Sequence, residues 1–255
     1  MFYGIWMVFA VAILFFTKLA YGETCETGTI VPLYLYPEIK NGVHNWQPLI
    51  DAYSNYSIPV WAIVNVHNGP GLQLDANYVH AINLLKANGI HTLGYVLTNY
   101  TRRAMSLAKQ DVDNWKTFYE PEGIFFDEMS NVRDENNVNY YKELDSYAKG
   151  KRFNVTVGNP GTAIDLAYVD AVDTIMIYES SGKFPHFSEY CANANYPKKK
   201  WGIFPYNLQS IADIRESILA AKNCVGFIYV TDDFGDNPWD TLPAYLNELF
   251  SLLKI

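Results

Sequence analysis

Runs of apolar, β-branched and aromatic residues recur eight times along the chain, each of a length typical of a buried strand. They cover residues 30–36, 61–66, 91–98, 123–127, 153–157, 172–178, 201–206 and 225–231. The runs are continuous rather than alternating, which is typical of parallel strands that are covered on both faces. The pattern therefore predicts eight parallel β-strands.

Segments with helical spacing lie between these runs and after the last one. The apolar positions are Tyr78, Ile82 and Leu85, then Ile211, Ile214, Ile218 and Ala221, and finally Leu242, Leu246, Leu249 and Leu253. Ser210 and Asp213 open the second of these helices with a capping-box pattern. Eight alternations of strand and helix in this length predict a single (β/α)8 TIM barrel. The alternative is an open doubly wound sheet, but the first strand is not followed by its G-x-G-x-x-G turn.

The first 22 residues have the pattern of a secretory signal peptide. Residues 2–16 are almost wholly apolar, fall short of the roughly 20 residues that span a bilayer, and lead to the small-x-small sequence Ala20-Tyr21-Gly22. Lys18 lies late and no basic residue precedes the apolar run, so an uncleaved N-terminal anchor is the alternative. We expect a signal peptide over 1–22, a barrel domain over 23–255, and a protein that is secreted or at the cell surface.

Two further features suit an oxidising, extracellular compartment. Asn55, Asn99 and Asn154 each begin an N-x-S/T triplet, the acceptor sequence for N-glycosylation. The three cysteines Cys25, Cys191 and Cys224 allow one disulfide, in three possible pairings. We favour Cys25 with Cys224, because they directly precede the first and the last strand, which become neighbours if the sheet closes.

Composition and charge exclude several classes of protein. Of 255 residues 49% are hydrophobic and 16% aromatic, which excludes a disordered chain. The formal net charge is −8, or −9 once Lys18 leaves with the signal, so a nucleic-acid partner is not expected. The five histidines never lie three or four apart, and the chain has no G-x-S-x-G, P-loop or C-x-x-C motif. We expect neither a metal nor a cofactor, no membrane span after signal removal, and a monomer.

The ends of the fourth and sixth predicted strands carry the candidate chemistry. Asp127 and Glu128 end the fourth run, and Glu179 follows the sixth. In a TIM barrel such positions lie at the catalytic rim, and two convergent carboxyl groups are what glycosidic cleavage requires. Neighbours on a strand point to opposite faces, so we assign the direct role to Asp127 and a supporting role to Glu128. The alternative is that Asp127 and Glu179 cap helix N-termini.

Other rim residues are candidates for substrate binding. Aromatic side chains can stack on sugar rings, and amide, hydroxyl or carboxylate groups can bind sugar hydroxyls or an acetamido group. The aromatic candidates are Tyr36, Tyr95, Tyr178, Tyr206 and Trp239, and the polar ones are Asn65, Thr98, Asn159 and Asp232. The alternatives are core packing for the aromatic set and turn formation for the polar set.

Five motifs carry a resemblance to a known family. They are VPLYLYP at 31–37, AIVN at 62–65 with GPG at 69–71, GYV at 94–96 with Thr98 and Arg102, GIFFDE at 123–128, and GNPG at 158–161. The chain resembles the spherulin-4 family, whose members resemble glycoside hydrolase family 135, secreted or cell-surface barrel enzymes. The resemblance implies Asp127 as nucleophile, Glu179 as acid/base, and Glu128 at a third acidic position. After strand seven, where such proteins often present a polar group, this chain has Phe204-Pro205-Tyr206-Asn207.

The leading hypothesis is a secreted, endo-acting glycoside hydrolase for α-1,4-linked polysaccharide that contains N-acetylgalactosamine. The alternative is a catalytically silent carbohydrate-binding or wall-structural protein on the same barrel. A deacetylase is disfavoured, because the short-range histidine pairs of many metal-dependent deacetylases are missing.

Overall fold

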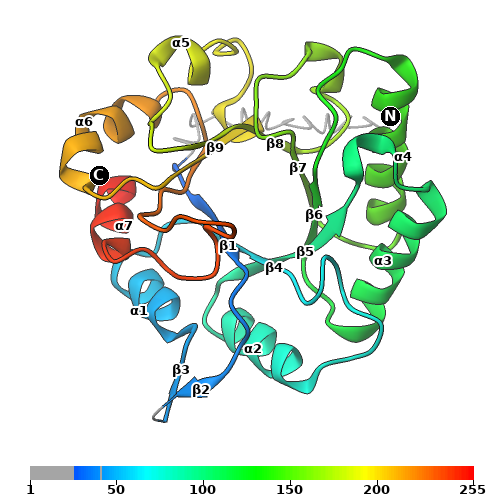
Figure 1. The fold of residues 1–255 in the computed structure, drawn as a ribbon, viewed down its shortest axis with the longest axis horizontal. Helices are drawn as coiled ribbons and strands as arrows, with labels where there is room; N and C mark the ends of the chain where they lie inside the picture. Colours follow the sequence, from blue (N-terminus) through cyan, green and yellow to red (C-terminus); the bar gives the residue numbers. More distant parts are fainter. Residues whose placement is uncertain (1–25, 41) are drawn as a thin grey trace, which may run out of the picture.

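The computed structural model describes residues 26–40 and 42–255, so the predicted signal peptide and Cys25 lie outside the described residues. Eight parallel strands form one sheet in sequence order. They are β1 (Thr29–Leu33), β4 (Val60–Val64), β5 (His91–Leu97), β6 (Gly123–Asp127), β7 (Val155–Asn159), β8 (Thr174–Ser181), β9 (Trp201–Tyr206) and β10 (Phe227–Ile228). Figure 1 shows the strands around the centre with helices outside them, which confirms the predicted (β/α)8 barrel.

The barrel closes between its first and last strands through Gly28. A parallel bridge joins Gly28 to Phe227, and the Gly28 N–H donates to the Gly226 carbonyl at 2.8 Å. A Cβ on residue 28 would lie 2.4 Å from the Pro59 carbonyl oxygen, so only glycine fits this position. Closure therefore rests on close backbone contact rather than on a long ladder of hydrogen bonds.

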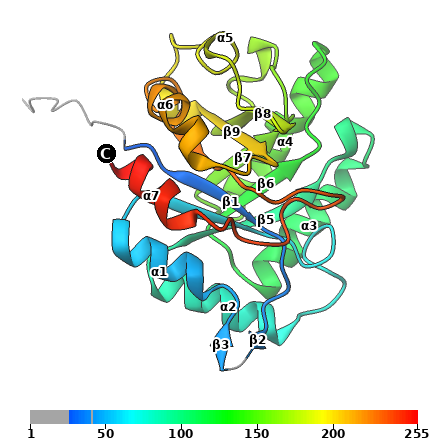
Figure 2. The ribbon, with the colours of Figure 1, turned by 60° about the vertical axis from the view of Figure 1, so that its left-hand side comes forward.

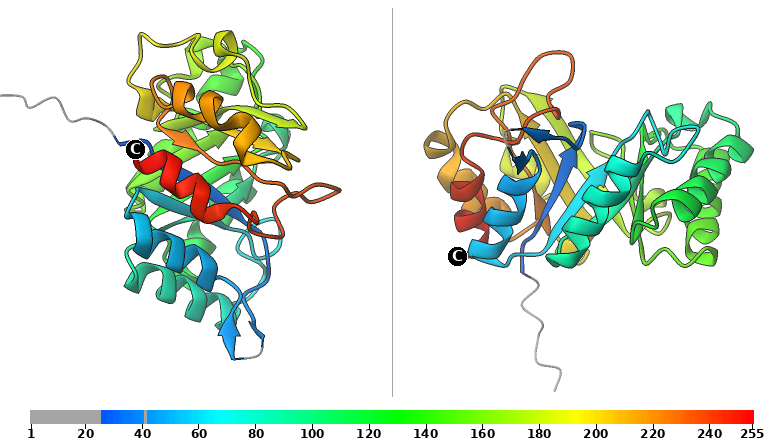
Figure 3. Two further views of the ribbon diagram at one scale, coloured as in Figure 1. Left: turned by 90° about the vertical axis from the view of Figure 1, so that its left-hand side faces the viewer. Right: turned by 90° about the horizontal axis from the view of Figure 1, so that it is seen from below.

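Helices cover the outside of the sheet (Figure 3), except that the connection between β7 and β8 holds only the short turn η2 in place of a predicted helix. They are α1 (Gln47–Tyr56), α2 (Ala76–Ala87), α3 (Met105–Phe118), α4 (Glu135–Gly150), α5 (Phe187–Tyr190), α6 (Ile211–Ala221) and α7 (Leu246–Lys254), with short turns η1 (Asn99–Thr101), η2 (Leu166–Tyr168) and η3 (Lys198–Lys200). The Ser210 side chain accepts from the Asp213 N–H at the start of α6, as predicted. Within the described part of the chain, none of the helices has the length and apolar character needed to cross a membrane.

Some element boundaries differ from the predicted ones. Strand β7 starts at Val155 rather than at residue 153, because the Phe153 N–H still bonds the Ala148 carbonyl at the end of α4. Helix α7 starts at Leu246, four residues later than the leucine spacing indicated, since Pro243 precedes it within a turn. A small hairpin of β2 (Ile39–Lys40) and β3 (Val43–His44) was not predicted, because it buries little of its apolar surface.

The disulfide differs from the favoured pairing. Cys191 bonds to Cys224, with 5.1 Å between their Cα atoms, so the preference for Cys25 with Cys224 was wrong. Cys191 directly follows α5 and Cys224 lies just after α6, and these two helices are in contact. The preference considered only the closing strands, whereas the bond forms in the outer helical layer.

Aromatic rings fill the barrel beneath the carboxyl ends of the strands. The Phe125 ring lies 6.2 Å from Tyr95 and 6.3 Å from Phe204, and Phe204 lies 5.8 Å from Trp239. Trp239 belongs to the loop between β10 and α7, which extends beyond the end of the strands in Figure 2. Each buried ring of this kind stabilises the fold by about 1.5 to 3 kcal/mol. The rim residues therefore stand on a rigid base.

Candidate active site

Two acids and one amide meet at the carboxyl ends of three neighbouring strands. Asp127 and Asn159 are the last residues of β6 and β7, and Glu179 lies on β8 just after an irregularity in its pairing with β9. The Asn159 Nδ2 group donates to Asp127 Oδ1 at 2.9 Å and to Glu179 Oε2 at 2.8 Å. Because both oxygens bond one nitrogen, they can be no more than about 6 Å apart, which is close to the carboxyl spacing of retaining glycosidases.

The loop after β7 fixes the orientation of the Asn159 amide. Its Oδ1 accepts from the Gly161 N–H at 3.0 Å, which directs Nδ2 toward the acids. The Gly161 carbonyl in turn accepts from the Glu179 N–H at 2.9 Å. Gly161 has a φ of +64°, and a Cβ there would lie 3.3 Å from the Glu179 Cβ. A glycine is therefore needed for the loop to pass beside Glu179.

The surroundings of the two acids favour different protonation states. Burial, reinforced by the charge of Asp127, raises the pKa of Glu179 to about 7. Burial also raises the pKa of Asp127, but hydrogen bonds from Tyr95, Asn159 and the Glu128 backbone oppose that shift. More donors thus stabilise the ionised form of Asp127, and Glu179 is the group that holds a proton near neutral pH.

Neither acid caps a helix, which argues against the alternative role. Helix α4 after β6 is capped by Asp134, whose side chain accepts from the Asn136 and Asn137 N–H groups. The short helix α5 after β8 is capped by His186. The carboxyl oxygens of Asp127 and Glu179 are therefore directed into the rim rather than into the helices that follow them.

Glu128 lies beside the pair in a left-handed backbone conformation, with a φ of +51°. Its carbonyl accepts from the Tyr100 N–H at 2.7 Å and from the Thr98 hydroxyl at 2.9 Å. Burial and the charge of Asp127 raise the pKa of the Glu128 carboxyl, while Arg102 opposes the shift. The sharp turn at Glu128 takes its side chain out of the strand alternation and keeps it at the rim.

Tyr95 and Tyr34 complete the immediate surroundings of the acids. Burial and the Asp127 carboxyl raise the pKa of the Tyr95 phenol, and the Tyr34 and Tyr95 rings pack edge to face with their centres 5.7 Å apart. Burial and the charges of Asp127 and Glu179 raise the pKa of Tyr34, so this phenol stays neutral. Sequence reasoning included Tyr95 but missed Tyr34. The available signal was its position directly after β1, equivalent to the rim positions of the other strands.

Two more of the predicted aromatic residues gather on the same side. The Tyr206 ring packs against Trp239 at 5.4 Å, and the Trp239 carbonyl accepts from the Tyr34 N–H at 3.0 Å. Through these contacts the loop after β10 is anchored beside the acids. Tyr206 and Trp239 therefore stay candidates for sugar contact.

The side chains of Thr98, Asn159 and Tyr178 make hydrogen bonds within the protein. The Thr98 side chain is fully buried and bonds the Asp127 carbonyl, the Glu128 carbonyl and the Tyr141 hydroxyl, so it supports the backbone of the acids. Both N–H donors of the Asn159 amide are already used by the acids. The Tyr178 hydroxyl donates to the Lys183 carbonyl, whereas the neighbouring Glu179 side chain accepts from Asn159.

The remaining polar candidates form turns or lie apart from the acid pair. Asn65 Oδ1 accepts from the Gly69 N–H, and the Asp232 carboxylate accepts from the Ala244 N–H. The exposed Tyr36 hydroxyl accepts from Asn77 beside the start of α2. None of these three has a hydrogen bond to Asp127 or Glu179 among the described residues.

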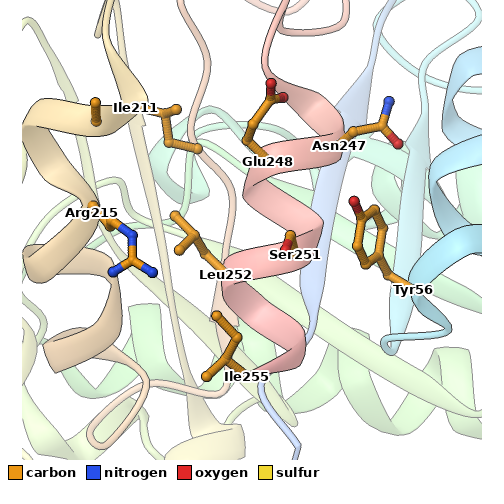
Figure 4. A pocket seen from close by; sticks show the side chains of 9 residues that line it. Tyr56, Ile211, Arg215, Asn247, Glu248, Ser251, Leu252 and Ile255 are labelled. Carbon is orange, nitrogen blue, oxygen red and sulfur yellow. The ribbon is translucent and has the colours of Figure 1, made fainter.

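The structure separates other features from this cluster. Of the predicted glycosylation acceptors, Asn55 and Asn154 are exposed, whereas Asn99 is half-buried and its Oδ1 accepts from Arg102. Over residues 26–40 and 42–255, no group of three or more His, Cys, Asp or Glu side chains is placed to hold a metal ion. A cavity of about 430 Å³ lies on the outer surface between α1, α6 and α7 (Figure 4), and neither acid lines it.

The fold and the bridged acids define a (β/α)8 barrel with a carboxyl pair at the carboxyl ends of its strands. The family model Spherulation-specific family 4 matches residues 28–253, and the chain belongs to this family. Spherulin-4 from Physarum polycephalum is 28% identical over 264 residues, covering 96% of this chain and 77% of the relative.

Solved structures share the architecture. Aspergillus clavatus Sph3 in complex with GalNAc has a TM-score of 0.80 at 22% identity, covering 90% of this chain and 98% of that one. A chitinase from Rhizomucor miehei has a TM-score of 0.54 at 12% identity, covering 88% and 99%. At these identities the likeness establishes the barrel fold.

Glu179→Gln should stabilise the protein, and more so at pH 8 than at pH 5. The pKa of this carboxyl group rises from 4.5 to about 7 on folding, so the protein loses stability as the pH rises between those values. The full cost above pH 7 is at most about 3 kcal/mol, and a neutral glutamine avoids it. Urea unfolding at both pH values measures the gain. The exposed control Glu216→Gln should change the stability by the same amount at pH 5 and at pH 8. A pH-independent gain for Glu179→Gln would contradict a raised pKa of Glu179.

Proposed function

We propose that the protein is a secreted glycoside hydrolase that cleaves within α-1,4-linked polysaccharide containing N-acetylgalactosamine. The observation that carries the proposal is the Asn159 bridge, which holds Asp127 and Glu179 at a short spacing in surroundings that favour different protonation states. The GalNAc bound in the structurally similar Sph3 supports the choice of sugar. The apolar N-terminal segment and the N-x-S/T triplets support secretion.

The proposed reaction uses each carboxyl group in the state that its surroundings favour. Asp127 attacks the anomeric carbon as a carboxylate while Glu179 donates its proton to the departing glycosidic oxygen. Glu179 then removes a proton from water, which releases the sugar from Asp127. The acetamido group of an α-linked N-acetylgalactosamine is cis to the leaving oxygen and poorly placed to displace it. An enzymatic nucleophile is therefore needed.

Glu128 has a supporting role in this scheme. It lies beside Asp127 and Arg102. Burial raises the pKa of its carboxyl group, and only the charge of Arg102 opposes that shift, whereas three hydrogen-bond donors oppose the shift of Asp127. A carboxyl group at this place can bind a sugar hydroxyl and adds to the negative potential that stabilises an oxocarbenium-like transition state.

Replacing either acid should abolish cleavage. Asp127→Asn and Glu179→Gln should each lower kcat/KM at least about 100-fold, because each removes one chemical step, and Glu128→Gln should have a smaller effect. Reducing ends released from purified α-1,4-galactosaminogalactan provide the measurement. The control Glu143→Gln removes an ion pair between α4 and Lys109 of α3 and should keep full activity. Full cleavage by Asp127→Asn or Glu179→Gln would refute the assignment, and polysaccharide binding without cleavage by wild type would favour a binding protein.

The first product should keep the α configuration at its new reducing end. The short carboxyl spacing leaves no room for a water between Asp127 and the sugar, so two inversions at the same carbon are expected. Proton NMR of a defined oligomer in the first minutes of hydrolysis, before mutarotation, distinguishes the anomers. Initial appearance of the β anomer would instead require an inverting mechanism.

Asn159→Ala should shift the alkaline limb of the pH profile of kcat/KM to higher pH. In wild type this limb of kcat/KM should lie near pH 7, where Glu179 loses its proton. The Asn159 bond lowers the pKa of Glu179, so its removal raises that pKa and shifts the limb to higher pH. Asn223→Ala is the matched control, since that exposed amide donates only to the Ala220 carbonyl at the end of α6 and bonds neither member of the pair. An unmoved limb in Asn159→Ala would contradict this coupling.

A further inference from the structure

An unusual backbone turn lies beside the acids. Asn99, Tyr100 and Thr101 have φ values of 48°, 53° and 70°, so three consecutive residues other than glycine are left-handed. This conformation is disfavoured for residues with a Cβ, and runs of it are rare. Strained backbone persists only where neighbouring contacts impose it, and it concentrates at functional sites.

Contacts from two other elements hold this turn in place. The Tyr100 N–H donates to the Glu128 carbonyl at 2.7 Å, so the turn is tied to the acid-bearing end of β6. The Thr101 hydroxyl donates to Asn137 Oδ1 on α4 at 2.7 Å. Arg102 donates to Asn99 Oδ1 at 3.0 Å and closes the turn from within. The turn is thus built against the rim and is not a free loop.

This turn places the aromatic ring of Tyr100 at the surface. Tyr100 is 47% exposed, although the fully buried Thr98 lies only two residues before it. The Arg102 guanidinium lies over one face of the ring, 5.5 Å from its centre, so a ligand would stack on the opposite face. Burial together with the charges of Glu128, Asp127 and Glu179 raises the pKa of the Tyr100 phenol, so the ring lies within the field of all three acids.

We propose that Tyr100 is a sugar-stacking subsite, which binds a pyranose ring of the polysaccharide next to the unit held at Asp127 and Glu179. This inference rests on the proposed function and extends it to substrate binding. The C–H face of a pyranose carries weak positive charge and packs on the electron-rich face of an aromatic ring. Arg102 and Glu128 beside the ring supply a donor and an acceptor for the sugar hydroxyls or acetamido group.

The subsite has a consequence for the predicted glycosylation of Asn99. A glycan is attached through the Asn99 Nδ2 atom, so it would leave the bond from Arg102 to Oδ1 in place but would crowd the ring of the neighbouring Tyr100. A functional subsite therefore requires Asn99 to be unmodified in the secreted protein, unlike a freely exposed acceptor such as Asn55. Peptide mapping by mass spectrometry measures this occupancy.

Titration calorimetry tests the subsite in the variant Glu179→Gln, which should bind the oligomer without cleaving it. Full-length Glu179→Gln protein is titrated with a defined α-1,4-linked N-acetylgalactosamine oligomer, alone and with Tyr100→Ala, Tyr100→Phe or Tyr56→Ala added. We expect Tyr100→Ala to weaken binding about tenfold through loss of the ring. Tyr100→Phe keeps the ring and should bind as the background does. Tyr56→Ala removes an aromatic ring from the outer cavity of Figure 4 and should also leave binding unchanged.

The outcomes separate this inference from the proposed function. Equal affinity of Tyr100→Ala and its background would overturn the subsite, as would equal weakening by Tyr100→Phe or a glycan found on Asn99. Binding that depends on Tyr100, with no cleavage by wild type, would support the subsite and overturn the hydrolase. Absence of any binding would overturn both. Thermal unfolding of each variant verifies that a loss of affinity is not a loss of fold.

Discussion

The Asn159 amide is the interaction on which the rest of the rim depends. Two carboxyl groups at this spacing repel each other when both are ionised, and burial strengthens the repulsion. A single NH₂ group that donates to both sets their separation and lowers the cost of charge on each. Gly161 fixes the amide from one side and bonds the backbone of Glu179 from the other. The last residue of β7 thereby links strands β6 and β8 through one side chain.

The surroundings of this bridge are arranged to keep it rigid. Thr98 and Tyr141 hold the backbone at Asp127, Glu128 and Ser130 with buried hydrogen bonds. The aromatic layer around Phe125 fills the barrel below, and the loop carrying Trp239 joins it from above. The left-handed backbone conformations at Glu128 and in the turn around Tyr100 lie where many neighbouring contacts hold the backbone. Such strain is tolerated because well-packed neighbours leave the backbone no alternative conformation.

Predictions from the sequence failed at positions where a side chain can either face the rim or make buried contacts. Thr98 follows an apolar run exactly as a rim residue does, but its hydroxyl satisfies buried carbonyls. Tyr178 and Glu179 are adjacent, and only the fold decides which one points into the rim. Tyr34 and Tyr100 were overlooked because aromatic residues are abundant in this chain and most of them are core. The disulfide was missed because contacts between outer helices leave no periodic signal.

The sequence by itself determined the strand count, the closed parallel barrel, the rim position of Asp127 and Glu179, and the start of α6 at Ser210. These follow from local rules of periodicity, capping and chain direction. Only the tertiary structure decided that Asn159 bridges the acids, that Cys191 pairs with Cys224, and that Tyr100 is displayed beside Glu128. Each of these depends on side chains from different strands or helices meeting at distances of a few ångströms. Hydrophobic patterns specify which face a residue takes, but not which partner it meets there.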